Sequence, residues 1–211
     1  MEKITLKKYI THNNKYVLFL VCAGVISALY TLSGAISYQT GQLLPLLDFE
    51  LNLPLIPWTI WIYIVLYPLY IIWCLLSYKD EIELNKLLYA FHAVTIFSCF
   101  IFIIFPVNYP RELYPLDSDM LKINEILFRF VRLVDKPSNC LPSLHVGFCF
   151  SFAFGWLRTD KLKFSISFLI ATAIAISTLT TKQHYAYDII AGFLVAVTSF
   201  TIFDKFTVIK D

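Results

Sequence analysis

The sequence has few charged residues for its length. Lysine, arginine, aspartate and glutamate make up 15% of the 211 residues, whereas a soluble domain carries about 25%. This scarcity excludes an ordinary soluble domain. The hydrophobic fraction is 58% and the mean hydropathy is +0.69, and both values indicate an integral membrane protein.

Several other signals are missing. The sequence has no run of basic residues and a formal net charge of only +2, which argues against a nucleic-acid partner. The five cysteines are an odd number without the spacing of a disulfide framework or a zinc motif. Cys140 alone lies at the edge of an apolar run, and we interpret it as structural rather than redox-active. No repeat is present, and we expect one membrane-embedded domain over residues 1–211 with its core at about 58–203.

What the sequence does contain is a series of six apolar runs. The first would span about 33 Å as a helix at 1.5 Å per residue, which is enough to cross a bilayer. It has no obvious cleavage site, so we expect a retained helix rather than a signal peptide. The sequence thus predicts an all-α polytopic membrane protein with six transmembrane helices. The predicted spans are residues 17–38, 58–78, 87–107, 141–157, 164–181 and 183–203.

Two segments between these spans have their own patterns. Residues 39–57 contain Pro45, Pro54 and Pro57, which rule out one straight helix; we expect a membrane-surface or re-entrant segment. Residues 121–134 place apolar side chains at helical spacing and charged ones mainly on the other side. This pattern predicts an additional amphipathic helix on the membrane surface.

An even number of spans puts both termini on one side of the membrane. The segments on that side hold 11 lysines and arginines, and the opposite segments hold 6. The positive-inside rule then favours a cytoplasmic N-terminus. The segments around Arg111, His145 and His184 would all lie on the outer face of the inner or plasma membrane.

The first chemically unusual stretch runs from Asn139 to Cys149. Pro142 suits the first turn of a helix, because its missing N–H would be unsatisfied there anyway. Backbone N–H groups around Ser143 at the positive end of the helix would bind phosphate. His145 in the same turn could give a proton to a leaving oxygen.

The second stretch is His184 to Asp188. Residues four apart share one helix face, so the carboxylate can hold one imidazole nitrogen protonated and leave the other free to attack. Together with His145, this pair predicts phosphoryl transfer through a phosphohistidine. Such transfer needs positive charge around the phosphate oxygens, for which Arg111, Lys136 and Lys182 are the candidates.

Other interpretations compete with this one. A membrane His–Asp pair can be structural, or can belong to a proton relay in a transporter of lipids or ions. The ionisable residues cluster at one face, which favours an enzyme over a relay. Histidine and aspartate are metal ligands, but tight ligand spacing is missing, so we predict no metal. A serine protease that uses Ser143 would lack a glycine-flanked serine.

These residues resemble the motifs of the type-2 phosphatidic acid phosphatase superfamily of membrane lipid phosphatases and phosphotransferases. The family's second motif is Pro-Ser-Gly-His, and residues 142–145 read Pro-Ser-Leu-His. Its third motif is Ser-Arg, five residues, His, three residues, Asp. Here Ser177 and Thr178 precede His184 and Asp188 at that spacing. With leucine in place of the glycine of the second motif, the sequence resembles the branch that contains inositol phosphorylceramide synthases.

The resemblance implies roles for individual residues. His184 would be the nucleophile, Asp188 its orienting partner, His145 the acid for the departing group, and Ser143 a phosphate ligand. The substrate would be a phospholipid or another lipid phosphate in the membrane, with water or a lipid hydroxyl as acceptor and no metal or other cofactor.

The sequence departs from the family in its cations. Thr178 replaces the phosphate-binding arginine, and the first motif (Lys, six residues, Arg-Pro) is not intact, because Arg111 follows Pro110 and Ile104 replaces the lysine. Loss of these cations favours transfer of a headgroup between lipids. Nothing in the sequence predicts the oligomeric state.

Overall fold

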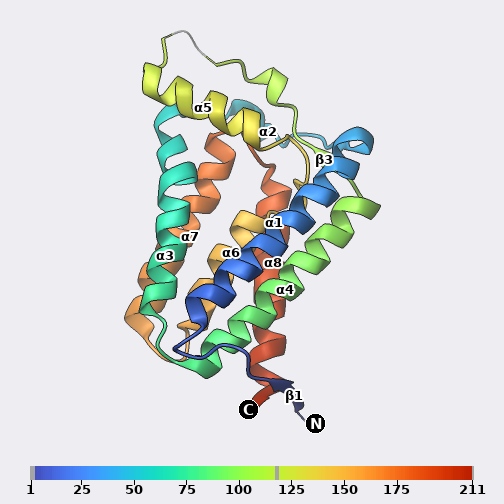
Figure 1. Ribbon diagram of the computed structural model, residues 1–211. Helices are drawn as coiled ribbons and strands as arrows, with labels where there is room; N and C mark the ends of the chain where they lie inside the picture. The colour runs from blue at the N-terminus through green and yellow to red at the C-terminus, as the bar shows by residue number, and fades with distance from the viewer. Residues whose placement is uncertain (1–2, 117–118, 211) are drawn as a thin grey trace.

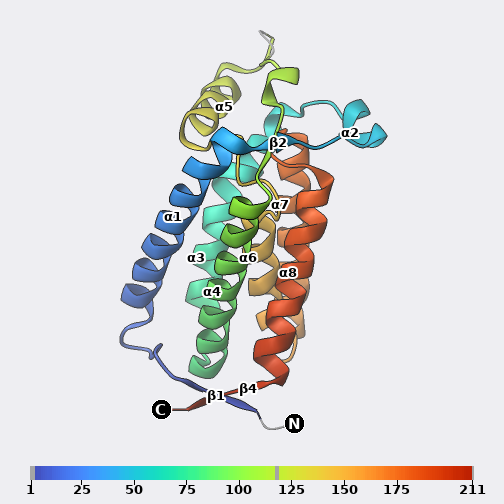
Figure 2. The same ribbon diagram turned by 90° about the vertical axis from the view of Figure 1, so that its right-hand side faces the viewer.

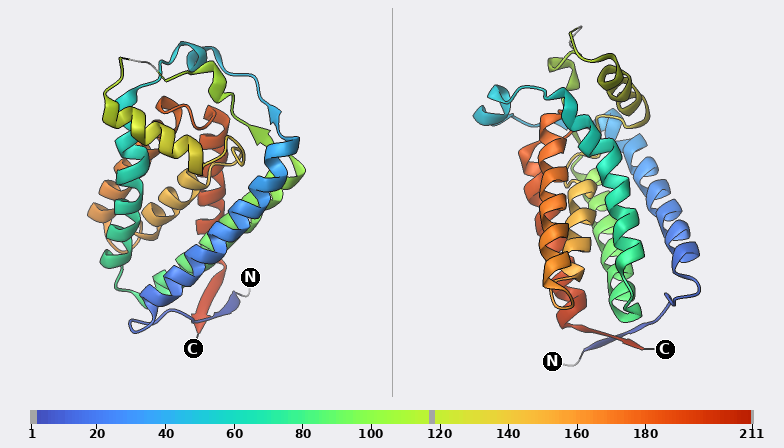
Figure 3. Two further views of the ribbon diagram at one scale, coloured as in Figure 1. Left: turned by 45° about the horizontal axis from the view of Figure 1, so that its top comes forward. Right: turned by 90° about the vertical axis from the view of Figure 1, so that its left-hand side faces the viewer.

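The structure, a computed structural model, describes residues 3–116 and 119–210. Its long helices run up and down in one bundle, and both termini lie at the same end (Figure 1). The opposite end carries helices α2 (Asp48–Asn52) and α5 (Lys122–Val134), and we call it the distal end. Figure 3 shows α5 and the segment between the first two long helices lying over this end.

Short strands join segments that are far apart in the sequence. β1 (Ile4–Lys7) pairs in parallel with β4 (Thr207–Lys210) beside the termini (Figure 2), and β2 (Gln42–Leu43) pairs in parallel with β3 (Val107–Asn108). The fold is thus mostly helical, and the all-α prediction omitted these two strand pairs. The other elements are α1 (Lys15–Thr40), α3 (Tyr67–Ser77), α4 (Glu81–Ile104), α6 (Leu144–Gly155), α7 (Lys161–Thr180), α8 (Ala186–Lys205), 3-10 turns at Pro57–Thr59 and Arg111–Leu113, and a π-helical turn at Ile62–Leu66.

Five helical segments are long and apolar enough to cross a membrane, as expected of an integral membrane protein. They correspond to the first, second, third, fifth and sixth predicted spans. The predicted fourth span is α6, which has 12 residues and a length of about 18 Å. A bilayer core is about 30 Å thick, so six complete spans are not confirmed. The spanning segments are Lys15–Thr40, Pro57–Ser77, Glu81–Ile104, Lys161–Thr180 and Ala186–Lys205.

Helix α6 is short because it lies inside the bundle rather than against lipid. Nine of its 12 residues are buried, and it packs between α4, α7 and α8. A helix surrounded by other helices can end before the membrane surface, because its end groups face protein and not hydrocarbon. Its first turn therefore brings the residues after Ser143 into the interior of the distal half of the bundle (Figure 1).

Helix α4 begins at Glu81, six residues before the predicted boundary of the third span, in a segment rich in charged residues. Asp80 is its N-cap, and one Asp80 carboxylate oxygen accepts the backbone N–H groups of Ile82 (2.8 Å) and Glu83 (3.1 Å). Such a cap stabilises a helix start by about 1 kcal/mol. The charged residue Asp80 thus stabilises the N-terminus of α4, and the charged segment does not interrupt the helix.

The amphipathic segment forms helix α5, as its periodicity predicts. Phe128 and Val131 are buried and pack against the segment that precedes α3. Ile126, Phe130 and Leu133 remain exposed. Part of the apolar face therefore contacts protein, and the placement of the rest against the membrane surface stays a prediction.

Helices α6 and α8 approach each other at Gly192. A Cβ atom added there would lie 2.5 Å from the carbonyl oxygen of Ser143 and 3.1 Å from the Cβ of Val146. Gly192→Ala should force the helices apart and destabilise the protein by about 1–3 kcal/mol. Thermal unfolding in detergent measures this loss. Gly24→Ala is the control, because an added Cβ there meets nothing within 4 Å; equal melting of the two variants would contradict the prediction.

Candidate active site

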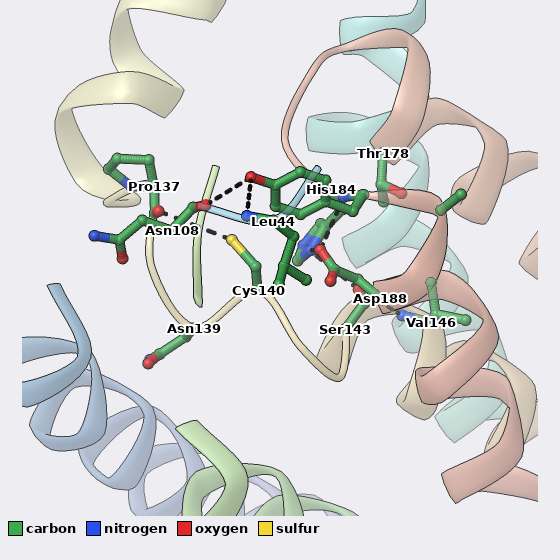
Figure 4. Close-up of polar contacts among 12 residues, drawn as sticks. Leu44, Asn108, Pro137, Asn139, Cys140, Ser143, Val146, Thr178, His184 and Asp188 are labelled. Carbon is green, nitrogen blue, oxygen red and sulfur yellow. Dashed lines mark hydrogen bonds and ion pairs between the residues drawn. The ribbon is translucent and has the colours of Figure 1, made fainter. Parts of the chain in front are cut away.

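Four of the predicted site residues lie together in the distal half of the bundle, where α6 and α8 begin. His184 lies in the loop before α8 and Asp188 in the first turn of that helix, while Ser143 is the N-cap of α6 and His145 lies in its first turn. Figure 4 shows Ser143, His184 and Asp188 side by side at this junction.

His184 is oriented by Asp188. The Nδ1 atom of His184 lies 3.1 Å from Oδ2 of Asp188, and the same oxygen accepts the backbone N–H of Tyr185 at 2.8 Å. Both side chains are buried, with exposed fractions of 5% and 0%. Because a carboxylate can only accept, Nδ1 carries the proton and Nε2 keeps its lone pair. The free nitrogen of His184 is thus the one that can attack an electrophile.

The two histidines meet, as the motifs predict. The ring centroids of His145 and His184 lie 5.9 Å apart. The His145 ring also contacts Tyr63 and Tyr67, at centroid distances of 4.9 and 4.7 Å. Tyr63 lies within the π-helical turn Ile62–Leu66, and Tyr67 follows this turn directly before Pro68. Proline has no N–H to complete the ordinary helical ladder, and π turns of this kind often occur at functional sites.

Ser143 faces His184, but Pro142 does not open the helix. The Oγ atom of Ser143 lies 3.4 Å from Nε2 of His184 and accepts the N–H of Val146 at 3.5 Å. Pro142 lies before the N-cap, after a cis peptide bond, so its predicted place in the first turn is wrong. The N–H of Ser143 donates to the carbonyl of Asp188 at 3.0 Å. Phosphate would therefore meet the next amides of the first turn, which have no acceptor within the helix.

Comparison with known proteins agrees with this geometry. The model of the PAP2 superfamily matches residues 49–202, which is most of the chain and includes both motifs. The chain belongs to the PAP2 superfamily. It is also similar to the crystal structure of LpxE from Aquifex aeolicus, with a TM-score of 0.51 and 20% identity over 74% of this chain and 86% of that one. This similarity shows a shared fold. No curated protein sequence gives a significant match.

Thr178, which replaces the arginine of the PAP2 third motif, has a structural role here. Its hydroxyl donates to the carbonyl of Ala175 at 2.7 Å. Its own carbonyl accepts the N–H groups of Gln183 (2.9 Å) and His184 (3.3 Å). Thr178 therefore closes the loop that carries the nucleophile candidate, and it brings no charge to the site.

Arg111 is connected to His145 by a chain of contacts through Asp135 and Tyr63. It is buried, and its guanidinium donates to the carbonyl of Asp135 and lies 3.4 Å from the Asp135 carboxylate. That carboxylate also accepts the hydroxyls of Tyr30 (2.9 Å) and Tyr63 (3.2 Å). Within the described residues, Nε of Arg111 is buried without a hydrogen-bond partner. This network links Arg111, through Tyr63, to the ring of His145.

The pKa of the Cys140 thiol responds to charges of both this network and the His184–Asp188 pair. Burial raises the pKa of the Cys140 thiol well above its usual value, and the nearby carboxylate of Asp188 raises it further. The guanidinium of Arg111 acts in the opposite direction.

The two predicted lysines have other contacts. Lys182 has a left-handed backbone conformation (φ 58°), and its ammonium donates to the carbonyl of Glu50 at 3.0 Å and lies 4.2 Å from the ring centroid of Tyr114. Burial lowers the pKa of Lys182, which Glu50 partly opposes. Lys136 is exposed, 5.0 Å from the ring centroid of Tyr38. These contacts do not bring either lysine to the histidines, and their role as phosphate ligands stays a prediction.

Sequence reasoning missed two carboxylates, the half-buried Asp135 and the buried Glu50. Asp135 holds the network described above, and Glu50 accepts the backbone N–H of Ala186 at 2.8 Å, directly at the start of α8. Glu50 is only 2% exposed, so the segment at 39–57 packs onto the site rather than only covering the membrane surface. The one signal in the sequence was the position of Glu50 within an apolar segment. Burial of a charged side chain costs free energy unless it has a partner.

Proposed function

We propose that this PAP2 protein cleaves a phosphate ester of a membrane lipid through a phosphohistidine on His184, without a metal ion. One observation carries the proposal: a buried imidazole, oriented by Asp188 with its free nitrogen exposed to Ser143, faces a second imidazole on another helix. A nucleophile with an orienting carboxylate and an adjacent acid is the arrangement that covalent catalysis needs.

The chemistry has two steps. First, Nε2 of His184 attacks phosphorus, the N–P bond forms, and the P–O bond to the lipid alcohol breaks while His145 gives its proton to the departing oxygen. Second, water or another lipid hydroxyl gives a proton to His145 and attacks phosphorus, and the N–P bond breaks. Asp188 stays ionised throughout and stabilises the charge that develops on His184.

The phosphate charge would be met by the start of α6 and by Arg111. Ser143, the N-cap of α6, lies beside His184, and a helix N-terminus favours an anion. The unpartnered Nε of Arg111 supplies a buried donor in the adjoining network. Preorganised donors of this kind commonly contribute most to the stabilisation of a developing charge.

A lipid substrate is supported by a cavity below the histidines. A volume of about 330 Å³ lies between α1, α3, α4 and α6, with a mainly apolar lining that includes Tyr67, Phe148 and Phe152. Tyr67 contacts the His145 ring. Phe148 and Phe152 follow His145 by three and seven residues, so they lie on its face of α6. An acyl chain attached to a phosphate at His145 would therefore extend into this cavity.

This placement predicts a chain-length effect. Ala23 lines the cavity from α1, and Ala23→Phe should lower kcat/KM for a long-chain lipid phosphate by about tenfold, or about 1.4 kcal/mol of lost packing. Cleavage of a short, water-soluble phosphate ester should be unchanged. Val25→Phe introduces the same side chain at an exposed position of the helix and serves as control. Equal effects on long and short substrates would contradict the prediction.

The acceptor and the branch of the superfamily are part of the proposal. The leucine at position 144 and the absence of the motif arginine at Thr178 support a transferase similar to inositol phosphorylceramide synthases. The chain would act as one domain, with its site on the outer face of the membrane, as the distribution of basic residues favours.

The experiment is incubation of the purified protein in detergent with a panel of phospholipids and lipid phosphates, followed by mass detection of both products. Release of phosphate or a phospho-headgroup into water indicates hydrolysis, and a new lipid that carries the headgroup indicates transfer. A brief reaction with labelled substrate should leave acid-labile label on the wild-type protein. Absence of any product across the panel would refute the proposed function. It would favour a transporter, whose activity is measured in sealed vesicles and not in detergent.

A further inference from the structure

Three potential metal ligands converge beside the catalytic pair. The Sγ of Cys140, a ring nitrogen of His184 and a carboxylate oxygen of Asp188 all lie within 4.8 Å of one another, and all three residues are buried. Cys140 is 1% exposed, and its thiol makes one long contact, 3.8 Å to the carbonyl of Pro137. Figure 4 shows the contact of the sulfur with Pro137 and the positions of His184 and Asp188 nearby.

The second observation is an unsatisfied oxygen. Oδ2 of Asp188 accepts from His184 and Tyr185, but among the described residues Oδ1 is buried without a hydrogen-bond partner. A buried carboxylate oxygen without a donor costs about 1–3 kcal/mol or more. Such an atom is normally satisfied by a ligand, a water molecule or an ion. It belongs to the same carboxylate that the cluster offers to a metal.

We propose that Cys140, His184 and Asp188 bind a soft divalent cation such as Zn²⁺ or Cd²⁺, and that the ion inhibits the protein. Thiolate, imidazole and carboxylate are the donors that Zn²⁺ takes in proteins. Its bonds of about 2.0–2.3 Å require the donors to close by about 1 Å from their present spread. The thiol proton is released to solvent when the metal–sulfur bond forms. Mg²⁺ prefers oxygen ligands in an octahedron and does not fit this donor set.

Inhibition rests on the proposed function, whereas binding does not. An ion on Nδ1 of His184 replaces the proton shared with Asp188 and ends the orientation of the ring. An ion on Nε2 occupies the lone pair that attacks phosphorus. Either position removes the nucleophile, so the ion is an inhibitor and not a cofactor.

The test is a titration of the purified full-length protein with Cd²⁺ after treatment with a chelator. The ultraviolet thiolate-to-cadmium charge-transfer band reports bonds to sulfur independently of activity. Wild type and Cys99→Ser should show the band with one equivalent bound and lose activity in parallel. Cys99 is the matched control, a buried cysteine of α4 whose sulfur lies 3.7 Å from the Ser33 hydroxyl.

Cys140→Ser should lose the band, and its inhibition should need at least about tenfold more Cd²⁺, relative to its own chelator-treated activity. Asp188→Asn should keep the band but bind about tenfold more weakly, which tests the site if the serine variant does not fold. An unchanged band in Cys140→Ser, no band in wild type, or activation by the ion would overturn the proposal. A band that depends on Cys140 in a protein without turnover would retain the metal site and reject the proposed function.

Discussion

His184→Ala should lower turnover of a lipid phosphate by at least about 10⁴-fold, because the variant has no atom that can form the N–P bond. The neighbouring groups that bind phosphate are unchanged, so substrate affinity should fall far less than kcat. The buried imidazole contacts Asp188 and Ser143 only through polar atoms, and its removal should leave the bundle folded. Phosphate or headgroup release, measured with purified protein in detergent, gives the rate.

The matched control is His12→Ala. His12 lies at the end of the bundle that carries the termini, and its side chain is 62% exposed. Its removal should leave both turnover and labelling unchanged. His184→Ala should also fail to retain acid-labile label from substrate. More than about a tenth of wild-type activity in a folded His184→Ala protein would rule out this residue as the nucleophile.

Asp188→Asn should reduce kcat by about 10³ to 10⁴-fold. The substitution keeps the shape of the side chain but removes its charge, and an amide can donate a hydrogen bond to Nδ1 of His184. The ring would then carry its proton on Nε2, the nitrogen that should attack. The developing imidazolium would also lose its partner, so KM should change little while kcat falls.

A purely structural role for Asp188 would give a different result. Its carboxylate also accepts the N–H of Tyr185, so loss of this bond could destabilise the start of α8. Asp160→Asn is the control, because Asp160 caps α7 by accepting the N–H of Lys163 at 3.0 Å and does not contact the histidines. Asparagine caps a helix about as well as aspartate, so both variants should lose well under about 1 kcal/mol of stability. Only Asp188→Asn should slow formation of the labelled protein; equal rates in the two variants would show that capping alone explains Asp188.

The environment of His145 depends on residues with no motif. Tyr63 and Tyr67 contact its ring, and Asp135 orients Tyr63 through the phenol hydroxyl. The same network contains one buried arginine, Arg111, beside the Asp135 carboxylate. The position of each member is set by α1, α3 and the segment after α5, which pack around the start of α6.

The sequence by itself determined most of the helices and the pairing of His184 with Asp188. Long apolar runs predict spanning segments because a bilayer fixes their length, and the spacing of His184 and Asp188 places them on one helix face. The meeting of His145 with His184 followed from the motifs and the direction of successive helices. These inferences rely on local periodicity, which the chain carries in any arrangement.

The tertiary structure alone decided which distant groups complete the site. Glu50 at the start of α8, Asp135 against Arg111 and Cys140 beside Asp188 join residues from separate segments, and no spacing in the sequence specifies such contacts. The same packing directs Lys182 toward Glu50 and allows α6 to remain short within the bundle. The physical reason is that burial of a polar or charged group depends on what packs against it from elsewhere in the chain, whereas hydrophobic periodicity records only that a face is buried.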